Sequence, residues 1–186
     1  MKIILGSGSP RRSQLLSELG FSFRVLKPEI DESIEAHWST FEVAEHLARK
    51  KSNALLNQIK HDEVLLCADT VVIDGDQILG KPASKEEAIQ MISRLSGSCH
   101  SVVTGVSLRN QRVHISFSEK TEVCFYPLTQ EEIIQYVDLY KPLDKAGAYG
   151  IQEWIGMIGV SSIKGSYTNV IGLPTSRLFQ ELKNFK

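Results

Sequence analysis

The fold is indicated first by the stretch Lys2-Ile3-Ile4-Leu5-Gly6-Ser7-Gly8-Ser9-Pro10-Arg11-Arg12. Its apolar start predicts a short buried strand over residues 2–5. Ser9 is a favourable helix N-cap and Pro10 suits the first helical position, so a helix is predicted over residues 10–19, ending at the next glycine. A strand, a glycine-rich turn and a helix in this order are typical of α/β proteins.

The same stretch has the composition of an anion-binding turn. Its glycines let the backbone approach an oxyanion, and the helix N-terminus offers unpaired N–H groups. Ser7 and Ser9 add hydroxyl donors, while Arg11 and Arg12 add forked donors that suit phosphate oxygens. The turn lacks the Lys-Ser/Thr ending of a P-loop, which argues against an NTPase of that type. From spacing alone, the alternative is a capped helix with two solvated arginines.

The rest of the chain alternates strand-like and helix-like segments. Three Ser/Thr-x-x-Glu capping boxes predict helix starts, at Ser39, Ser84 and Thr129. The predicted helices cover residues 39–58, 84–95, 129–140 and 174 onward, and the predicted strands cover 21–26, 64–68, 71–73, 77–79, 101–108, 113–126, 157–163 and 169–171. Because hairpins interrupt the alternation, we expect a mixed α/β sheet flanked by helices rather than a purely doubly wound one.

Length and charge exclude several classes of protein. A chain of 186 residues is predicted to form one domain, 1–186. Its 21 basic and 22 acidic residues leave a formal net charge of −1, so no general attraction to a nucleic acid polymer or an anionic membrane is expected. The apolar runs are far shorter than the roughly 20 residues that cross a bilayer. The apolar stretch at residues 3–5 is also shorter than that of a signal peptide, so none is expected.

The cysteines and histidines do not predict a zinc site. Cys67, Cys99 and Cys124 form an odd set without CxxC spacing, and the histidines show neither HxH nor HExxH spacing. Each cysteine lies in an apolar or strand-like segment. We therefore expect three buried free thiols, as in a reducing cytosol, and a cytoplasmic protein.

Asp69 and Thr70 follow the most apolar run of the chain, residues 64–68. A carboxylate at the end of a strand lies at the rim of the sheet, where open α/β sheets bind ligands. There Asp69 could hold a divalent cation or orient a water molecule as a general base. The hairpin that follows returns the chain toward its start, so Lys81 is predicted near the same rim. The alternatives are a turn-forming Asp69 and an exposed loop lysine.

Three further segments are less decisive. Glu32 in its polar stretch, and Lys51 on the helix predicted over residues 39–58, read by themselves as solvated charges. Residues 144–152 contain small side chains without an amphipathic period, so packing alone does not explain them. They suit a backbone-lined loop over a flat or phosphate-bearing ligand. Gln152 would offer a donor and an acceptor to a base edge.

Taken in order, these segments resemble the Maf family of nucleoside triphosphate pyrophosphatases. The resemblance covers essentially the whole chain and rests on Ser7-Gly8-Ser9-Pro10-Arg11-Arg12, Asp31-Glu32-Ser33, Leu47-Ala48-Arg49-Lys50-Lys51, Ala68-Asp69-Thr70, Gly80-Lys81-Pro82, Leu95-Ser96-Gly97, Asp144 to Gln152 and Gly165 to Pro174. It implies a single Maf-like domain with a curved mixed sheet flanked by helices, split into two lobes around a central cleft, as in inosine triphosphatases.

The resemblance also implies the reaction. Family members hydrolyse a nucleoside triphosphate between the α- and β-phosphates, giving the monophosphate and pyrophosphate. The chain is similar to the subgroup that prefers dTTP and UTP, because that subgroup's selectivity positions are occupied by Arg11, Thr70 and Gln152. Such enzymes are expected to remove modified pyrimidine nucleotides as well.

Site roles follow from the resemblance position by position. Asp69 is the expected proton acceptor, Lys81 is expected to assist catalysis, and Glu32 with Asp69 is expected to bind Mg²⁺ or Mn²⁺. The phosphate chain is expected to contact Ser7, Arg12, Lys51, Lys81 and Lys145. A metal and several cations are what a triphosphate needs, because its charge must be offset before in-line attack.

The chain departs from the family pattern at three positions, and alternatives remain. Gly6 stands where alanine is common, Cys67 replaces a usual glycine, and Glu153 replaces the glycine that usually follows Gln152.

One alternative is a nucleotide-binding regulator of cell division and septum formation that needs no turnover. Another is a pyrophosphatase of m⁷GTP or of purine nucleotides. A homodimer is expected from the resemblance.

Overall fold

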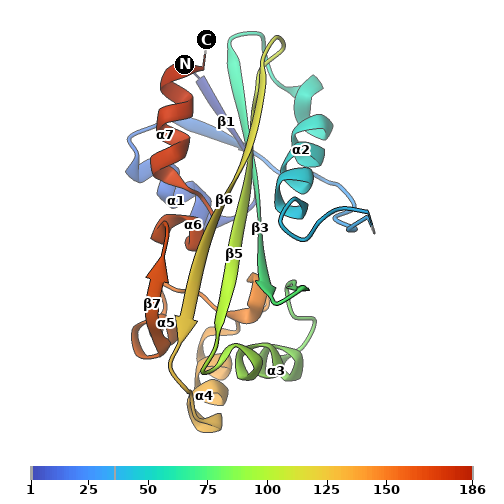
Figure 1. Cartoon of the computed structure of the whole chain (residues 1–186). Helices are drawn as coiled ribbons and strands as arrows, with labels where there is room; N and C mark the ends of the chain where they lie inside the picture. The colour runs from blue at the N-terminus through green and yellow to red at the C-terminus, as the bar shows by residue number, and fades with distance from the viewer. Residues whose placement is uncertain (1, 36, 186) are drawn as a thin grey trace. The chain divides into compact units, whose positions relative to one another are not determined.

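The computed structural model describes residues 2–35 and 37–185, and its strands form one mixed sheet (Figure 1). The sheet has seven strands in the order β2-β1-β3-β5-β6-β7, with β4 paired to β3. The strands are β1 (Lys2–Gly6), β2 (Phe23–Leu26), β3 (Glu63–Asp74), β4 (Gln77–Leu79), β5 (Cys99–Arg109), β6 (His114–Phe125) and β7 (Val160–Lys164). Strand β1 is parallel to β2 and β3, while the β3–β4 and β6–β7 pairs are antiparallel. The predicted mixed α/β class is confirmed.

The helices of the described residues connect these strands. They are α1 (Pro10–Glu18), α2 (Val43–Leu55), α3 (Lys85–Leu95), α4 (Gln130–Tyr140), α5 (Trp154–Gly159), α6 (Tyr167–Ile171) and α7 (Thr175–Asn184), with short 3₁₀ turns η1 (Leu56–Gln58) and η2 (Ala146–Ala148). Within the described part of the chain, no helix has the length and apolar character needed to cross a membrane.

The chain divides into two compact units. The first runs through Thr70 and adds Thr104–Glu119 and the chain from Gly172, whereas the second consists of Val71–Val103 and Lys120–Ile171. Strands β3, β5 and β6 contribute residues to both units.

In the first unit, helices cover both faces of the sheet. Helices α7 and α2 lie on opposite sides of the strands in Figure 1. Gly105 of β5 explains how closely α2 approaches, because a Cβ there would lie 2.3 Å from the Ala44 carbonyl carbon. On the other face, the Arg177 guanidinium of α7 lies 4.3 Å from the centroid of the Phe117 ring. Burial on both faces explains the unbroken apolar run of β1.

In the second unit, α3, α4 and α5 share one apolar core with β4. Ile92, Leu95, Tyr136 and Ile155 are among its fully buried members. Both predicted helix caps in this unit are confirmed, since the Ser84 and Thr129 side chains accept hydrogen bonds from backbone N–H groups one turn into their helices.

The sequence prediction is wrong about the start of α2. The helix begins at Val43, four residues after the predicted cap at Ser39. The Ser39 hydroxyl donates to the Glu42 carboxylate over 2.6 Å, and the Glu42 N–H donates to the Ser39 carbonyl over 2.9 Å. These bonds close a turn that precedes the helix, so Ser39 and Glu42 contact each other as in a capping box, but the helix does not begin at Ser39.

Two strand predictions in the last third of the chain are also wrong. Residues 157–159 belong to α5 and residues 169–171 belong to α6. The Ser166 hydroxyl accepts from the Asn169 N–H over 3.3 Å, which is the bond of a helix N-cap. At α5, a Cβ on Gly156 would lie 1.9 Å from the Ile151 carbonyl oxygen, so only glycine permits this tight helix start.

Gly6 and Cys67 turn out to be neighbours. They are paired in the register of β1 and β3, and a Cβ on Gly6 would lie 2.3 Å from the Cys67 sulfur. The two departures from the family pattern therefore compensate each other, because the glycine on one strand makes room for the larger side chain on the other. Cys67 is a buried free thiol, as predicted.

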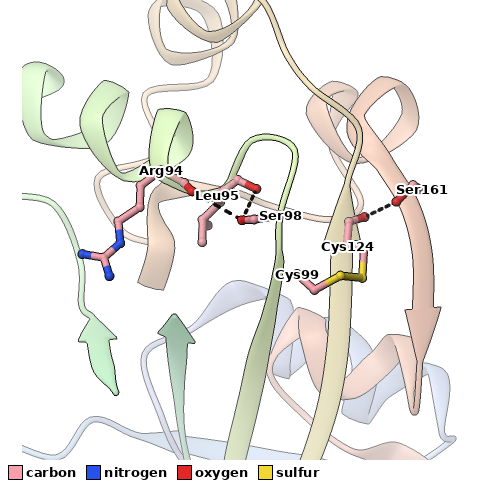
Figure 2. The surroundings of a disulfide bond; sticks show 6 residues. All are labelled: Arg94, Leu95, Ser98, Cys99, Cys124 and Ser161. Carbon is pink, nitrogen blue, oxygen red and sulfur yellow. Dashed lines mark hydrogen bonds between the residues drawn. A yellow bond between two sulfur atoms is a disulfide. The ribbon is translucent and has the colours of Figure 1, made fainter. Parts of the chain in front are cut away.

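The prediction of free thiols is wrong for the other two cysteines. Cys99 and Cys124 form a disulfide between β5 and β6 (Figure 2), and their Cα atoms lie 4.0 Å apart. Hydrogen bonds from Asn110 N–H to the Val113 carbonyl and from Phe125 N–H to the Ser98 carbonyl define a single antiparallel register. That register places the two cysteines directly opposite each other.

Removing this disulfide is expected to destabilise the protein. The bond joins residues 25 apart, and a cross-link of that span contributes roughly 3 kcal/mol to the free energy of unfolding. Cys99→Ser, and dithiothreitol acting on the wild-type protein, should each lower the denaturant midpoint. The reductant should leave the midpoint of Cys99→Ser unchanged. Titration of three free thiols in the unreduced, unfolded wild-type chain would contradict the disulfide.

Candidate active site

In the first unit, the turn between β1 and α1 holds an arginine in a fixed orientation. The Ser7 hydroxyl oxygen accepts from the Ser9 N–H over 3.2 Å and from the Arg12 Nη1 over 3.1 Å. Ser7 is 5% exposed. The turn therefore presents Arg12 from the first turn of a helix, as the sequence predicts.

Arg12 also joins segments that are remote in the sequence. Its Nη2 donates to the Thr70 hydroxyl over 3.0 Å, and its Nε donates to the carbonyl of Gly172 over 2.8 Å, across 160 residues. The Thr70 and Thr104 hydroxyls lie 2.9 Å apart. A guanidinium has five N–H donors, so these bonds fix its plane and leave further N–H groups for an anion. Burial lowers the pKa of Arg12, and the nearby Asp69 opposes that effect.

Lys51 lies between two carboxylates in the same unit. Its ammonium group is 2.9 Å from Glu32 Oε1 and forms a second, shorter ion pair with Asp69. The Lys51 side chain is 7% exposed and that of Asp69 is 12% exposed, whereas Glu32 is 45% exposed. The predicted site residues Glu32, Lys51 and Asp69 are thus in direct contact.

Asp69 is not at the end of its strand, contrary to the prediction, because β3 continues to Asp74. The parallel partner β1 ends at Gly6, opposite Cys67, and β4 pairs with β3 only from Val72 onward. Asp69 therefore lies two residues beyond the last parallel pair between β1 and β3. Because the neighbouring strand β1 ends before it reaches Asp69, this residue still lies at a rim of the sheet, as the sequence predicted.

The carboxylates of Glu32 and Asp69 fit a divalent cation of the magnesium type. Both already contact one cationic group, the ammonium of Lys51. Magnesium is usually held by one or two carboxylates, with water and substrate phosphates completing its shell. Among the described residues there is no group of three or more His, Cys, Asp or Glu side chains of metal-site geometry. The two carboxylates therefore fit the protein's share of such a magnesium shell.

Cys67 precedes this cluster in β3 but does not add a nucleophile to it. Burial raises the pKa of its thiol to about 12, against smaller opposite effects of Lys51 and Arg12. The thiolate is the reactive form of cysteine, so Cys67 acts as a small apolar side chain here.

In the second unit, the segment that carries Lys81 lies against the loop of residues 144–152. The Gly147 N–H donates to the Gly80 carbonyl over 3.0 Å. Gly147 has a φ of 67°, and a Cβ there would lie 2.9 Å from a Val72 methyl group. Close packing therefore requires Gly147, in addition to any ligand.

Lys145 is a buried cation in this loop. It is 8% exposed, and its ammonium lies 2.9 Å from Asp144 Oδ1 and 3.1 Å from Glu153 Oε1. The prediction that Lys145 lies in a loop is confirmed, and its partner Glu153 is one of the positions that departs from the family pattern.

Gln152 presents an unsatisfied acceptor. Its side-chain oxygen Oε1 is buried and has no hydrogen-bond partner among the described residues. A buried amide oxygen without a donor costs free energy, so this atom indicates a site where a ligand N–H would be favourable.

The structure thus gathers six predicted residues in the first unit: Ser7, Arg12, Glu32, Lys51, Asp69 and Thr70. Arg11 is half-buried beside them on α1. The predicted residues Lys81, Lys145 and Gln152 belong to the second unit, and their meeting with Asp69 stays a prediction. Sequence reasoning missed Thr104 and the Gly172 carbonyl. For Glu153 there was a signal, since a charged residue stood at a glycine position.

Comparison with known proteins identifies relatives over the full chain. The family model described as Maf-like protein matches residues 2–185. The chain is 48% identical over 185 residues to a protein of Parabacteroides distasonis named dTTP/UTP pyrophosphatase. The match covers 99% of this chain and 96% of the relative. A protein of the same name from Bacteroides thetaiotaomicron is 46% identical, covering 98% of this chain and 95% of the relative.

A solved structure gives the fold independently. The Ham1 protein of Staphylococcus aureus superposes with a TM-score of 0.50, covering 97% of this chain and 100% of that chain. The identity is 17%, so the likeness is one of fold.

Proposed function

Because this chain belongs to the Maf family, we propose that it is a nucleoside triphosphate pyrophosphatase that converts dTTP and UTP to the monophosphate and pyrophosphate. The observation that carries the proposal is the cluster in which Lys51 joins Glu32 and Asp69, next to the Arg12–Thr70 contact. This cluster combines a carboxylate able to orient water with the cations that a polyphosphate requires.

The cations are proposed to hold the phosphate chain. Ser7 and Arg12 offer donors at the N-terminus of α1, where the helix dipole also favours an anion. Lys51 adds a charge in the first unit, and Lys81 and Lys145 add two in the second. Because Ser7 and Arg12 are held by hydrogen bonds before substrate binds, little reorganisation of these two groups is needed when charge develops in the transition state.

Asp69 is proposed to orient the attacking water and accept its proton. An aspartate has a reference pKa near ~3.9, so it is a weak base and needs an acidified water. Glu32 and Asp69 would hold Mg²⁺ or Mn²⁺, which when bound supplies that acidification and offsets phosphate charge. In this arrangement the Lys51 ammonium turns from the carboxylates to a phosphate oxygen, keeping the local charge balanced.

Base recognition is proposed to involve Arg11, Thr70 and Gln152. Uracil and thymine carry an N3–H donor, which would satisfy the buried acceptor of Gln152, whereas cytosine presents an acceptor at N3. Thr70 acts less directly, because its hydroxyl is bonded to Arg12 and Thr104.

A nucleotide panel tests this function. We expect kcat/KM with Mg²⁺ to be highest for dTTP and UTP and at least ~10²-fold lower for CTP, as for sites whose buried polar groups would be left unpaired. The Gln152→Met variant, of similar length, should lose most of this discrimination. Preferred turnover of m⁷GTP or of a purine nucleotide would replace the substrate assignment, and no turnover of any nucleotide would overturn the enzyme assignment.

Three wider proposals accompany this function. One family model spans both compact units, which supports a single Maf-like domain. The proposed substrates are nucleoside triphosphates, which supports a cytoplasmic location, although the Cys99–Cys124 disulfide removes the argument from free thiols. The homodimer is proposed from the resemblance and is checked by sedimentation velocity.

A further inference from the structure

In the second unit, Lys145 contacts Glu153, which in turn contacts Tyr136. Neither Glu153 nor Tyr136 has a role in the function proposed above. Glu153 uses both carboxylate oxygens: Oε1 lies 3.1 Å from the Lys145 ammonium, and Oε2 accepts a hydrogen bond from the Tyr136 hydroxyl. The Glu153 side chain is 18% exposed and that of Lys145 is 9% exposed. Tyr136 is fully buried on α4.

The Tyr136 hydroxyl is itself fixed by the loop. It accepts a hydrogen bond from the Gly150 N–H over 3.0 Å while it donates to Glu153. Burial and the neighbouring Glu153 raise the pKa of Tyr136, so the phenol keeps its proton and remains a donor. Its ring also stacks on Tyr140, with centroids 5.0 Å apart. One phenol on a rigid helix therefore holds both the backbone of the loop and the carboxylate that contacts Lys145.

We propose that Tyr136 and Glu153 are positioning residues, which hold the Lys145 ammonium in the orientation that binds the triphosphate. The inference rests on the proposed function, because Lys145 is the group that would contact phosphate. Lysine has a flexible four-carbon stem, so an unrestrained ammonium must be ordered when substrate binds. Two carboxylates contact this ammonium, and the Asp144 side chain is 57% exposed, whereas Glu153 is 18% exposed and held by Tyr136. The Tyr136–Glu153 pair therefore orders the ammonium beforehand.

Electrostatic attraction alone predicts the opposite effect of removing the Glu153 charge. Glu153 is an anion beside a proposed phosphate-binding cation, so without a positioning role its removal should strengthen triphosphate binding. If Glu153 positions Lys145, Glu153→Gln should weaken binding instead. The same weakening should follow from Tyr136→Phe, which changes no charge.

The binding experiment uses α,β-methylene-dTTP with Mg²⁺, because this analogue cannot be cleaved between its α- and β-phosphates. We expect Tyr136→Phe and Glu153→Gln each to raise its Kd, and the KM for dTTP, by ~10-fold, the scale of losing one preordered side chain. We expect kcat to change less than KM. The matched control is Tyr140→Phe, one turn along α4 and 40% exposed, which should leave both constants within twofold.

A double-mutant cycle separates positioning from loss of stability. In a Lys145→Met background, adding Tyr136→Phe should have no further effect on Kd, because the residue to be positioned is absent. Additive effects of the two substitutions, or tighter binding by Glu153→Gln, would overturn the inference. Absence of dTTP turnover in the wild-type protein would instead overturn the proposed function, so the two failures are distinguishable.

Discussion

Replacing Asp69 with asparagine is expected to lower kcat for dTTP hydrolysis by at least ~10²-fold, the usual contribution of a positioned general base. Asparagine keeps the shape of the side chain but has no negative charge, so it neither accepts the proton of water nor attracts a divalent cation. It also leaves the Lys51 ammonium paired with Glu32 alone. The measurement is steady-state release of pyrophosphate, together with a thermal unfolding curve that shows the variant is folded.

The control for this variant is Asp74→Asn, the same substitution in the same strand. Asp74 forms an ion pair with Arg94 at the end of β3 and takes no part in the proposed chemistry. Its kcat should stay within twofold of wild type. Near-normal turnover by folded Asp69→Asn would reject the role of Asp69. A cellular division phenotype that persists in this variant, with nucleotide binding intact, would favour the regulatory alternative.

Replacing Arg12 with lysine is expected to lower kcat/KM by ~10²-fold and to destabilise the first unit. A lysine has no fork, so it can retain about one of the three contacts that Arg12 makes with Ser7, Thr70 and the Gly172 carbonyl. Each hydrogen bond of a charged group contributes ~1.5–3 kcal/mol, so at the lower end of that range losing two corresponds to about two decades in kcat/KM if they position the substrate contacts.

The matched control is Arg112→Lys, in the exposed turn between β5 and β6. It should change neither kcat/KM nor the unfolding midpoint. If Arg12→Lys shifted only the midpoint and kept wild-type kcat/KM, Arg12 would be a structural residue without a part in substrate binding.

Local signals predicted much of the fold. The strand–turn–helix at residues 2–19 and the caps at Ser84 and Thr129 lie where expected, because each depends on residues within one or two turns of the chain. The failures have non-local causes. Strand β3 extends beyond Asp69 because β4 pairs with it, and α5 forms where Gly156 permits close backbone packing.

The candidate site shows the same division. Residue types and their order pointed to Ser7, Arg12 and Asp69, but the bond from Arg12 to the Gly172 carbonyl spans 160 residues and no local pattern reveals it. Likewise, nothing in the sequence pairs Tyr136 with Glu153, since Tyr136 lies on α4 and Glu153 precedes α5, and the two meet only after the core of the second unit has packed.

The most direct measurement is ³¹P NMR of dTTP incubated with Mg²⁺ and either wild-type protein or Asp69→Asn. A carboxylate that directs water to the bond between the α- and β-phosphates predicts equal amounts of dTMP and pyrophosphate from the wild type and almost none from the variant. Formation of dTDP and orthophosphate, or equal product from both proteins, would contradict it.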